Sequence, residues 1–94
     1  MIRLNVFFEM KDGNDIEKVI ELGEELVAKS LKDEGNVAYD LFLSSTRPLV
    51  MMICETWQNE EVLKAHMAST HFTELVPKIE SYTKNGLKLE KFEF

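Results

Sequence analysis

Cysteine, arginine and long apolar runs are scarce in this sequence, and each scarcity excludes a class of protein. The single Cys54 rules out an internal disulfide framework and a cysteine-based zinc site, and it fits a reducing compartment. The only arginines are Arg3 and Arg47, and without a basic block the chain is not a general nucleic-acid binder. No apolar run approaches the ~20 residues of a membrane span. Because the start also lacks the features of a signal peptide, we expect a cytoplasmic protein that binds neither nucleic acid nor a membrane.

The composition that is present fits a single globular domain over residues 1–94. Hydrophobic residues make up 45% of the chain and charged residues 30%, a balance that disordered chains do not have. A chain of 94 residues is close to the size at which one hydrophobic core just suffices for independent folding. The length therefore favours support from a partner subunit.

The first half of the chain predicts a strand, a helix and a hairpin. Alternation of apolar and polar residues predicts a strand over 2–10. The helix that follows has an apolar stripe of period 3.6 that includes Gly23, whose missing side chain should let the helix approach the sheet closely. Gly35 suits the left-handed position at the end of this helix. The stripe consists of Ile16, Val19, Ile20, Gly23, Leu26, Val27 and Leu31. Residues 37–45 and 49–56 predict two strands joined by a short polar loop.

The second half predicts an interrupted helical segment and a last strand. A helix is expected over 60–68, and a second helical segment over 71–82. Within that segment Pro77 is expected to kink or divide the helix, because proline has no amide hydrogen. Residues 87–94 predict a strand whose apolar positions change phase, which suggests a bulge near residues 90–91.

The order strand, helix, strand, strand, helix, strand is that of a ferredoxin-like βαββαβ unit. The predicted fold class is α+β, with a four-stranded antiparallel sheet and both helices on one face. Phe7, Phe42, Phe92 and either Met51 or Met52 are expected on the other face. A large exposed apolar surface usually marks an interaction site, so we expect a homodimer.

Several motifs resemble the antibiotic biosynthesis monooxygenase superfamily. They are the stretch 33–41, Glu55-Thr56-Trp57, Leu63-Lys64-Ala65-His66 and the His71-Phe72 pair that follows Thr70. The resemblance covers essentially the whole chain. It implies a dimeric α/β barrel made from two ferredoxin-like sheets, with a pocket between the sheet and the helices of each subunit. Several members of that superfamily oxidise quinols or polyphenols with molecular oxygen and no metal or flavin.

The resemblance therefore implies a cofactor-independent monooxygenase acting on a small quinol or polyphenol-like aromatic. The stretch 33–41 and the region around His71 also look similar to the autoinducer-2-degrading protein, which isomerises or transfers groups on a phosphorylated sugar-like dione. An isomerase or transferase acting on a small oxygenated metabolite is thus one alternative, and a non-catalytic dimer that binds a small molecule is another. Haem degradation is not expected, because His66 and Val76 stand where that branch has Trp and His.

The expected catalytic residues are His66 and Asn5. A neutral imidazole near pH 7 can take the proton of a phenolic hydroxyl, which makes an electron-rich ring reactive toward oxygen. The alternative for His66 is a structural role at the helix end or against Glu55. Asn5 is expected to anchor the substrate or the reduced oxygen species, unless neighbouring backbone groups satisfy its amide. The expected substrate-binding residues are Trp57, Tyr39, Phe72, His71 and Glu55.

Most of these binding residues have a structural alternative. Trp57 either walls a pocket or belongs to the core, and Tyr39 either donates to substrate oxygens or packs at an edge. Glu55 either orients His66 or shares a proton with the substrate, or it lies at a solvated strand end. His71 either reaches the substrate or holds the turn between helical segments. Since His71 lies five positions after His66 and no carboxylate triad surrounds the two histidines in sequence, we expect no metal site.

Overall fold

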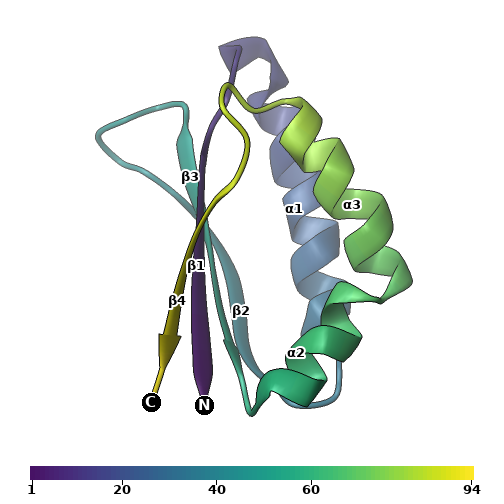
Figure 1. Ribbon diagram of the computed structural model, residues 1–94. Helices are drawn as coiled ribbons and strands as arrows, with labels where there is room; N and C mark the ends of the chain where they lie inside the picture. Colours follow the sequence, from purple (N-terminus) through teal and green to yellow (C-terminus); the bar gives the residue numbers. More distant parts are fainter.

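The computed structural model has one four-stranded antiparallel sheet, and all its helices lie on the same face of that sheet (Figure 1). In chain order the elements are β1 (Ile2–Glu9), η1 (Gly13–Asp15), α1 (Ile16–Ser30), β2 (Asn36–Leu43), β3 (Val50–Trp57), α2 (Glu60–Met67), α3 (Thr70–Ser81) and β4 (Lys88–Glu93). The strands are arranged in the order β2-β3-β1-β4. The predicted ferredoxin-like α+β fold is confirmed. None of the helices has the length and apolar character that crossing a membrane requires.

The pairing registers determine which side chains share a face of the sheet. Leu4 of β1 lies opposite Glu55 of β3, and Asn5 lies opposite Cys54. Tyr39 of β2 lies opposite Glu55 from the other side. Because successive side chains of a strand point to opposite faces, the buried Leu4, Glu55 and Tyr39 face the helices. Asn5 and Cys54 face away from them, on what we call the open face.

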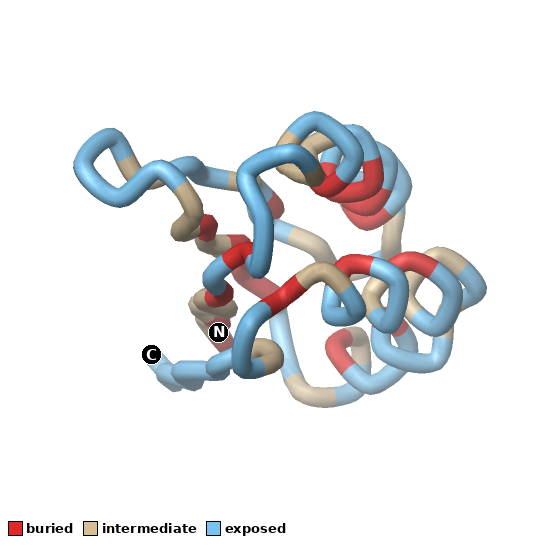
Figure 2. The backbone as a smooth tube through the Cα atoms, turned by 90° about the horizontal axis from the view of Figure 1, so that it is seen from above, coloured by how far each residue is buried: buried red, intermediate tan, exposed pale blue.

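The hydrophobic core lies between the sheet and the helical layer, where Figure 2 shows the buried residues gathered. As predicted, Gly23 allows α1 to approach the sheet closely, since an added Cβ would lie 2.6 Å from Leu41 Cδ2. The predicted stripe of α1 is wrong at one end, because the helix ends at Ser30 and Leu31 is 53% exposed. Leu22, outside that stripe, is buried instead.

Pro77 does not divide the second helical region. The interruption predicted between residues 68 and 71 is present at Ala68 and Ser69, and α3 then runs unbroken from Thr70 to Ser81 with the proline inside it. Leu75 and Ile79 are buried on the two sides of Pro77. Their packing anchors the helix before and after the residue that cannot donate a backbone hydrogen bond.

The bulge expected near residues 90–91 is also absent, because β4 pairs with β1 without a register shift. The apolar residues of β4 instead lie on both faces of the sheet. Leu89 lies opposite Val6 on the side of the helices, whereas Phe92 lies opposite Arg3 on the open face. Strand β4 is exposed along its whole length, as Figure 2 shows near the C-terminus. The register irregularity of this sheet lies in β2 instead, between Asn36 and Ala38.

Candidate functional site

Three chain segments bring polar side chains together at the end of the molecule where α2 lies in Figure 1. The segment after α1 carries Asp33 and turns at Gly35, whose φ is +79°. A Cβ at Gly35 would meet an α2 side chain at 2.5 Å, so only glycine fits this close turn. Helix α2 places His66 in its last turn. The side chain of Ser69 then caps α3, which carries His71 in its first turn.

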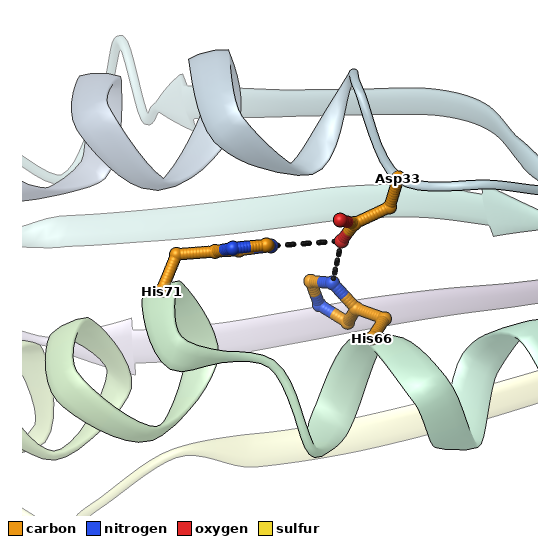
Figure 3. A group of neighbouring side chains, drawn as sticks. All are labelled: Asp33, His66 and His71. Atoms are coloured by element: carbon orange, nitrogen blue, oxygen red, sulfur yellow. Dashed lines mark hydrogen bonds and ion pairs between the residues drawn. The ribbon is translucent and has the colours of Figure 1, made fainter.

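Asp33 connects the two histidines, as Figure 3 shows. Its Oδ2 lies 2.8 Å from His66 Nδ1 and 2.8 Å from His71 Nε2. A carboxylate oxygen only accepts hydrogen bonds, so each of these ring nitrogens carries the proton that it donates. Asp33 is not among the residues expected from sequence. The only signal for it is its place at the start of the 33–41 motif, far along the chain from both histidines.

The second ring nitrogen of His66 faces Glu55. His66 is buried, and its Nε2 lies 4.0 Å from Glu55 Oε1 with no hydrogen-bond partner. Trp57 Nε1 donates to that same Glu55 oxygen at 2.9 Å, and the indole lies against the imidazole with ring centroids 4.4 Å apart. Trp57 is fully buried and therefore supports the cluster from the core. We call Asp33, Glu55, His66 and His71 the polar cluster.

Burial controls proton binding in this region. Burial raises the pKa of the Glu55 carboxyl to about 7, although the hydrogen bond from Trp57 opposes the change. Burial lowers the pKa of His66, opposed by the hydrogen bond and charge of Asp33. The pKa of the Tyr39 hydroxyl is raised by burial and by the negative charge of Glu55. Near neutral pH Glu55 is therefore poised to exchange a proton, while Tyr39 keeps its own.

Glu55 also lines a cavity of about 230 Å³ between the sheet and α3, which we call the apolar pocket. Its walls are formed by Leu4, Val6, Tyr39, Ile53, Glu55, Met67, Phe72, Val76, Leu87 and Leu89. Of the expected substrate-binding residues, Tyr39, Glu55 and Phe72 line this pocket. Trp57 and His71 do not. The expected base, His66, is separated from the pocket by Glu55.

Asn5 lies apart from the polar cluster. It pairs with Cys54 in β3 and with Glu90 in β4, and its side chain points to the open face. The sheet therefore separates Asn5 from His66 within one chain. The two expected catalytic residues therefore do not meet within one chain, and the alternation along β1 alone could not decide which face Asn5 takes.

Asp33, His66 and His71 also form the one group of side chains with metal-ligand character. Their donor atoms lie within 4.8 Å of one another, and two histidines with one carboxylate hold metal ions in some proteins. Here both ring nitrogens point at a single Asp33 oxygen at 2.8 Å, which is the spacing of direct hydrogen bonds. Asp33 thus forms a direct hydrogen bond with each histidine.

On the surface beside the cluster lies a second concavity of about 280 Å³, which we call the acidic groove. It is lined by Asp33, Glu34, Glu61, Val62, Ala65 and His66. The polar cluster therefore lies between the apolar pocket and an acidic concavity on the surface. Glu61 lines the groove but takes no part in the cluster, so a substitution of Glu61 is a matched control for substitutions in the cluster.

Comparison with known proteins gives consistent results. The sequence matches the family model described as antibiotic biosynthesis monooxygenase over residues 1–78, which include the polar cluster. A Bacillus subtilis (strain 168) protein named "Putative monooxygenase YcnE" is 31% identical over 78 residues, which cover 83% of this chain and 81% of that protein. A conserved protein of unknown function from Bacteroides thetaiotaomicron VPI-5482, described as a possible oxidoreductase, has a crystal structure with 56% identity and a TM-score of 0.90, over 99% of this chain and 96% of that one. The crystal structure of an antibiotic biosynthesis monooxygenase has 29% identity and a TM-score of 0.92, over 100% and 98% of the two chains.

Proposed function

This chain belongs to the antibiotic biosynthesis monooxygenase family, and we propose that it is a cofactor-independent monooxygenase of a small quinol or polyphenol-like aromatic. The observation that carries this proposal is the apolar pocket, in which one carboxyl group, Glu55, lies among hydrophobic walls. A neutral ring is stabilised by burial in such a cavity, and a ring hydroxyl can donate to Glu55. The volume of about 230 Å³ is below the roughly 300–1,000 Å³ of sites for larger ligands, which favours a single small ring.

Glu55 is the residue that meets the substrate in this proposal. A carboxyl group with a pKa of about 7 can take a phenolic proton near neutral pH, and the phenolate that results gives electrons to oxygen more readily. A quinol that reacts with one O₂ yields a hydroxyquinone and one water, so the ring supplies all the electrons. Such a reaction needs no added reductant. His66, expected from sequence to be the base, acts in this account through Glu55.

The pocket disfavours the alternative substrate, a phosphorylated sugar-like dione. No Lys, Arg or His lines the apolar pocket, so a phosphate there would be a buried charge without a partner beside a carboxyl group. Arg47 and Lys88 line a different concavity. The charge distribution therefore favours a neutral aromatic.

We also propose that a second copy of the chain covers the open face. Phe42, Met52 and Phe7 form a row across β2, β3 and β1, and Phe92 lies on the same face. Phe42 and Phe92 are each 49% exposed. Packing two such sheets face to face would bury these side chains and form the expected α/β barrel. Residues 1–94 then act as one domain of a cytoplasmic homodimer, a location that the lone Cys54 supports.

The experiment that tests the function is oxygen uptake by the metal-free protein with a panel of hydroquinones and polyphenols. Spontaneous oxidation is subtracted, and wild type is compared with Glu55→Gln and with the control Glu61→Gln. We expect uptake by the wild type and the control, and its loss in Glu55→Gln. Uptake no faster than the spontaneous reaction would reject the oxygenase. Quenching of the single Trp57 by the same compounds without turnover would show instead a binding protein.

A further inference from the structure

His66 is held between two carboxyl groups that come from different parts of the fold. On one side its Nδ1 lies 2.8 Å from Asp33 Oδ2. On the other side its Nε2 lies 4.0 Å from Glu55 Oε1, and Glu55 lines the apolar pocket. Trp57 stacks against the ring and keeps it in place. The three side chains thus form a row that begins at the pocket wall.

The hydrogen bond to Asp33 fixes the tautomer of His66. Because Asp33 accepts from Nδ1, the neutral ring has its lone pair on Nε2. That atom is buried and has no hydrogen-bond partner. It faces a carboxyl oxygen that can share a hydrogen bond with it only when a proton is present between them. The two atoms lie 4.0 Å apart, which is beyond the range of a direct hydrogen bond.

Burial lowers the pKa of His66, and the hydrogen bond and negative charge of Asp33 oppose that effect. The titratable groups that face it are Asp33 from the segment after α1, Tyr39 from β2, Glu55 from β3 and His71 from α3. Two of them are carboxyl groups. His71 donates to Asp33, which holds the Asp33 carboxylate in position toward His66.

We propose that His66 stores the proton that Glu55 takes from the substrate, and that Asp33 positions and supports the charged ring. The proposal rests on the proposed function for the origin of that proton. The substrate hydroxyl loses a proton to Glu55, and Glu55 passes it to His66 Nε2, where the ring becomes an imidazolium between two carboxylates. The proton later returns through Glu55 to the reduced oxygen atom that leaves as water. Each group then recovers its starting state, because the Nδ1 proton never leaves its bond to Asp33.

The test is the ¹⁵N NMR spectrum of the histidine-labelled protein, recorded against pH without substrate. The chain has only two histidines, so all their ring nitrogens can be assigned. We expect His66 to keep the proton on Nδ1 and to gain one on Nε2 as the pH falls. In Asp33→Asn a neighbouring negative charge is lost, so the pH of that second protonation should fall by roughly one unit or more. In Glu55→Gln the group that exchanges the proton with Nε2 is lost, so the titration of His66, broadened in the wild type by its coupling to Glu55, should become that of a single independent site. Glu61→Gln removes the same charge from the groove and should leave it nearly unchanged.

The outcomes separate this inference from the proposed function. The proposal that His66 stores the proton is wrong if Nε2 carries the proton of the neutral His66 ring. It is also wrong if Glu61→Gln changes the titration of His66 as much as Asp33→Asn and Glu55→Gln do. It is also wrong if one equivalent of Zn²⁺ removes the Nδ1 proton of His66 and shifts His71 Nε2, because the cluster is then a metal centre. If the Asp33→Asn variant does not fold, the Glu55→Gln variant alone tests the inference. Its Gln side chain can still accept the hydrogen bond from Trp57 Nε1. If the spectra are as expected but the protein takes up no oxygen, the proposal that His66 stores a proton stands and the proposal of an oxygenase is rejected.

Discussion

The buried Glu55 should make the stability of the protein depend on pH in a direction opposite to that of most carboxyl groups. Burial raises its pKa from an ordinary value of 4.5 to about 7. The folded state therefore binds this proton more tightly than the unfolded state does. The stabilising contribution is complete below about pH 4.5 and is lost as the pH rises through about 7. At about 1.4 kcal/mol per pKa unit, the loss amounts to ~3 kcal/mol.

Urea unfolding of the wild type and of Glu55→Gln, at a series of pH values, measures this effect. Gln keeps an oxygen that can accept from Trp57, but it has no proton to lose. Relative to Glu55→Gln, the wild type should therefore lose ~3 kcal/mol in free energy of unfolding between about pH 4.5 and pH 7 or above. His66 works in the opposite direction, since its lowered pKa favours the folded state as pH rises, and the comparison largely cancels it. The difference in free energy of unfolding between the two proteins could instead be constant with pH, or change in favour of the wild type as the pH rises. Either result would refute the claim that Glu55 is buried with a raised pKa.

Two further predictions concern the turn beside the cluster and the open face. Gly35→Ala should lower the free energy of unfolding by roughly 1–3 kcal/mol in urea titration, because a left-handed residue gains a Cβ 2.5 Å from Val62. Gly13→Ala, whose Cβ would meet its nearest neighbour at 3.7 Å, should change it little, and equal losses would contradict the account. Phe42→Asp should convert the proposed dimer to a monomer in sedimentation experiments. Leu31→Asp, which changes a similarly exposed residue at the end of α1, should not. A monomeric wild type, or a dimer that tolerates Phe42→Asp, would reject the open face as the interface.

Local patterns were sufficient to predict most of the fold. The alternation in β1, the 3.6-residue period of α1 and the close approach at Gly23 are properties of short stretches, and each is found in the structure. The errors fall where a short stretch is ambiguous. The shift of apolar positions in β4 fits either a bulge or a strand with apolar residues on both faces, and only its pairing with β1 distinguishes the two.

The site was predictable only in part, because it is built from contacts distant in sequence. His66, Glu55 and Tyr39 were recognisable as residue types near one another in the predicted fold. Asp33 was not, since its partnership with both histidines depends on the turn at Gly35 bringing the end of α1 against α2. The face on which Asn5 lies likewise depends on which side of the sheet the helices cover.

The most direct test of the central claim is the rate of oxygen uptake against pH, from about pH 5 to 9, with the hydroquinone that the wild type oxidises fastest. If Glu55 takes the substrate proton in the apolar pocket, the wild-type rate should rise with pH through an apparent pKa near 7, and Glu55→Gln should lose both the rate and that rise. Glu61→Gln should retain both. An unchanged rate and pH profile in Glu55→Gln would contradict the account, because the substrate proton would then go to another group.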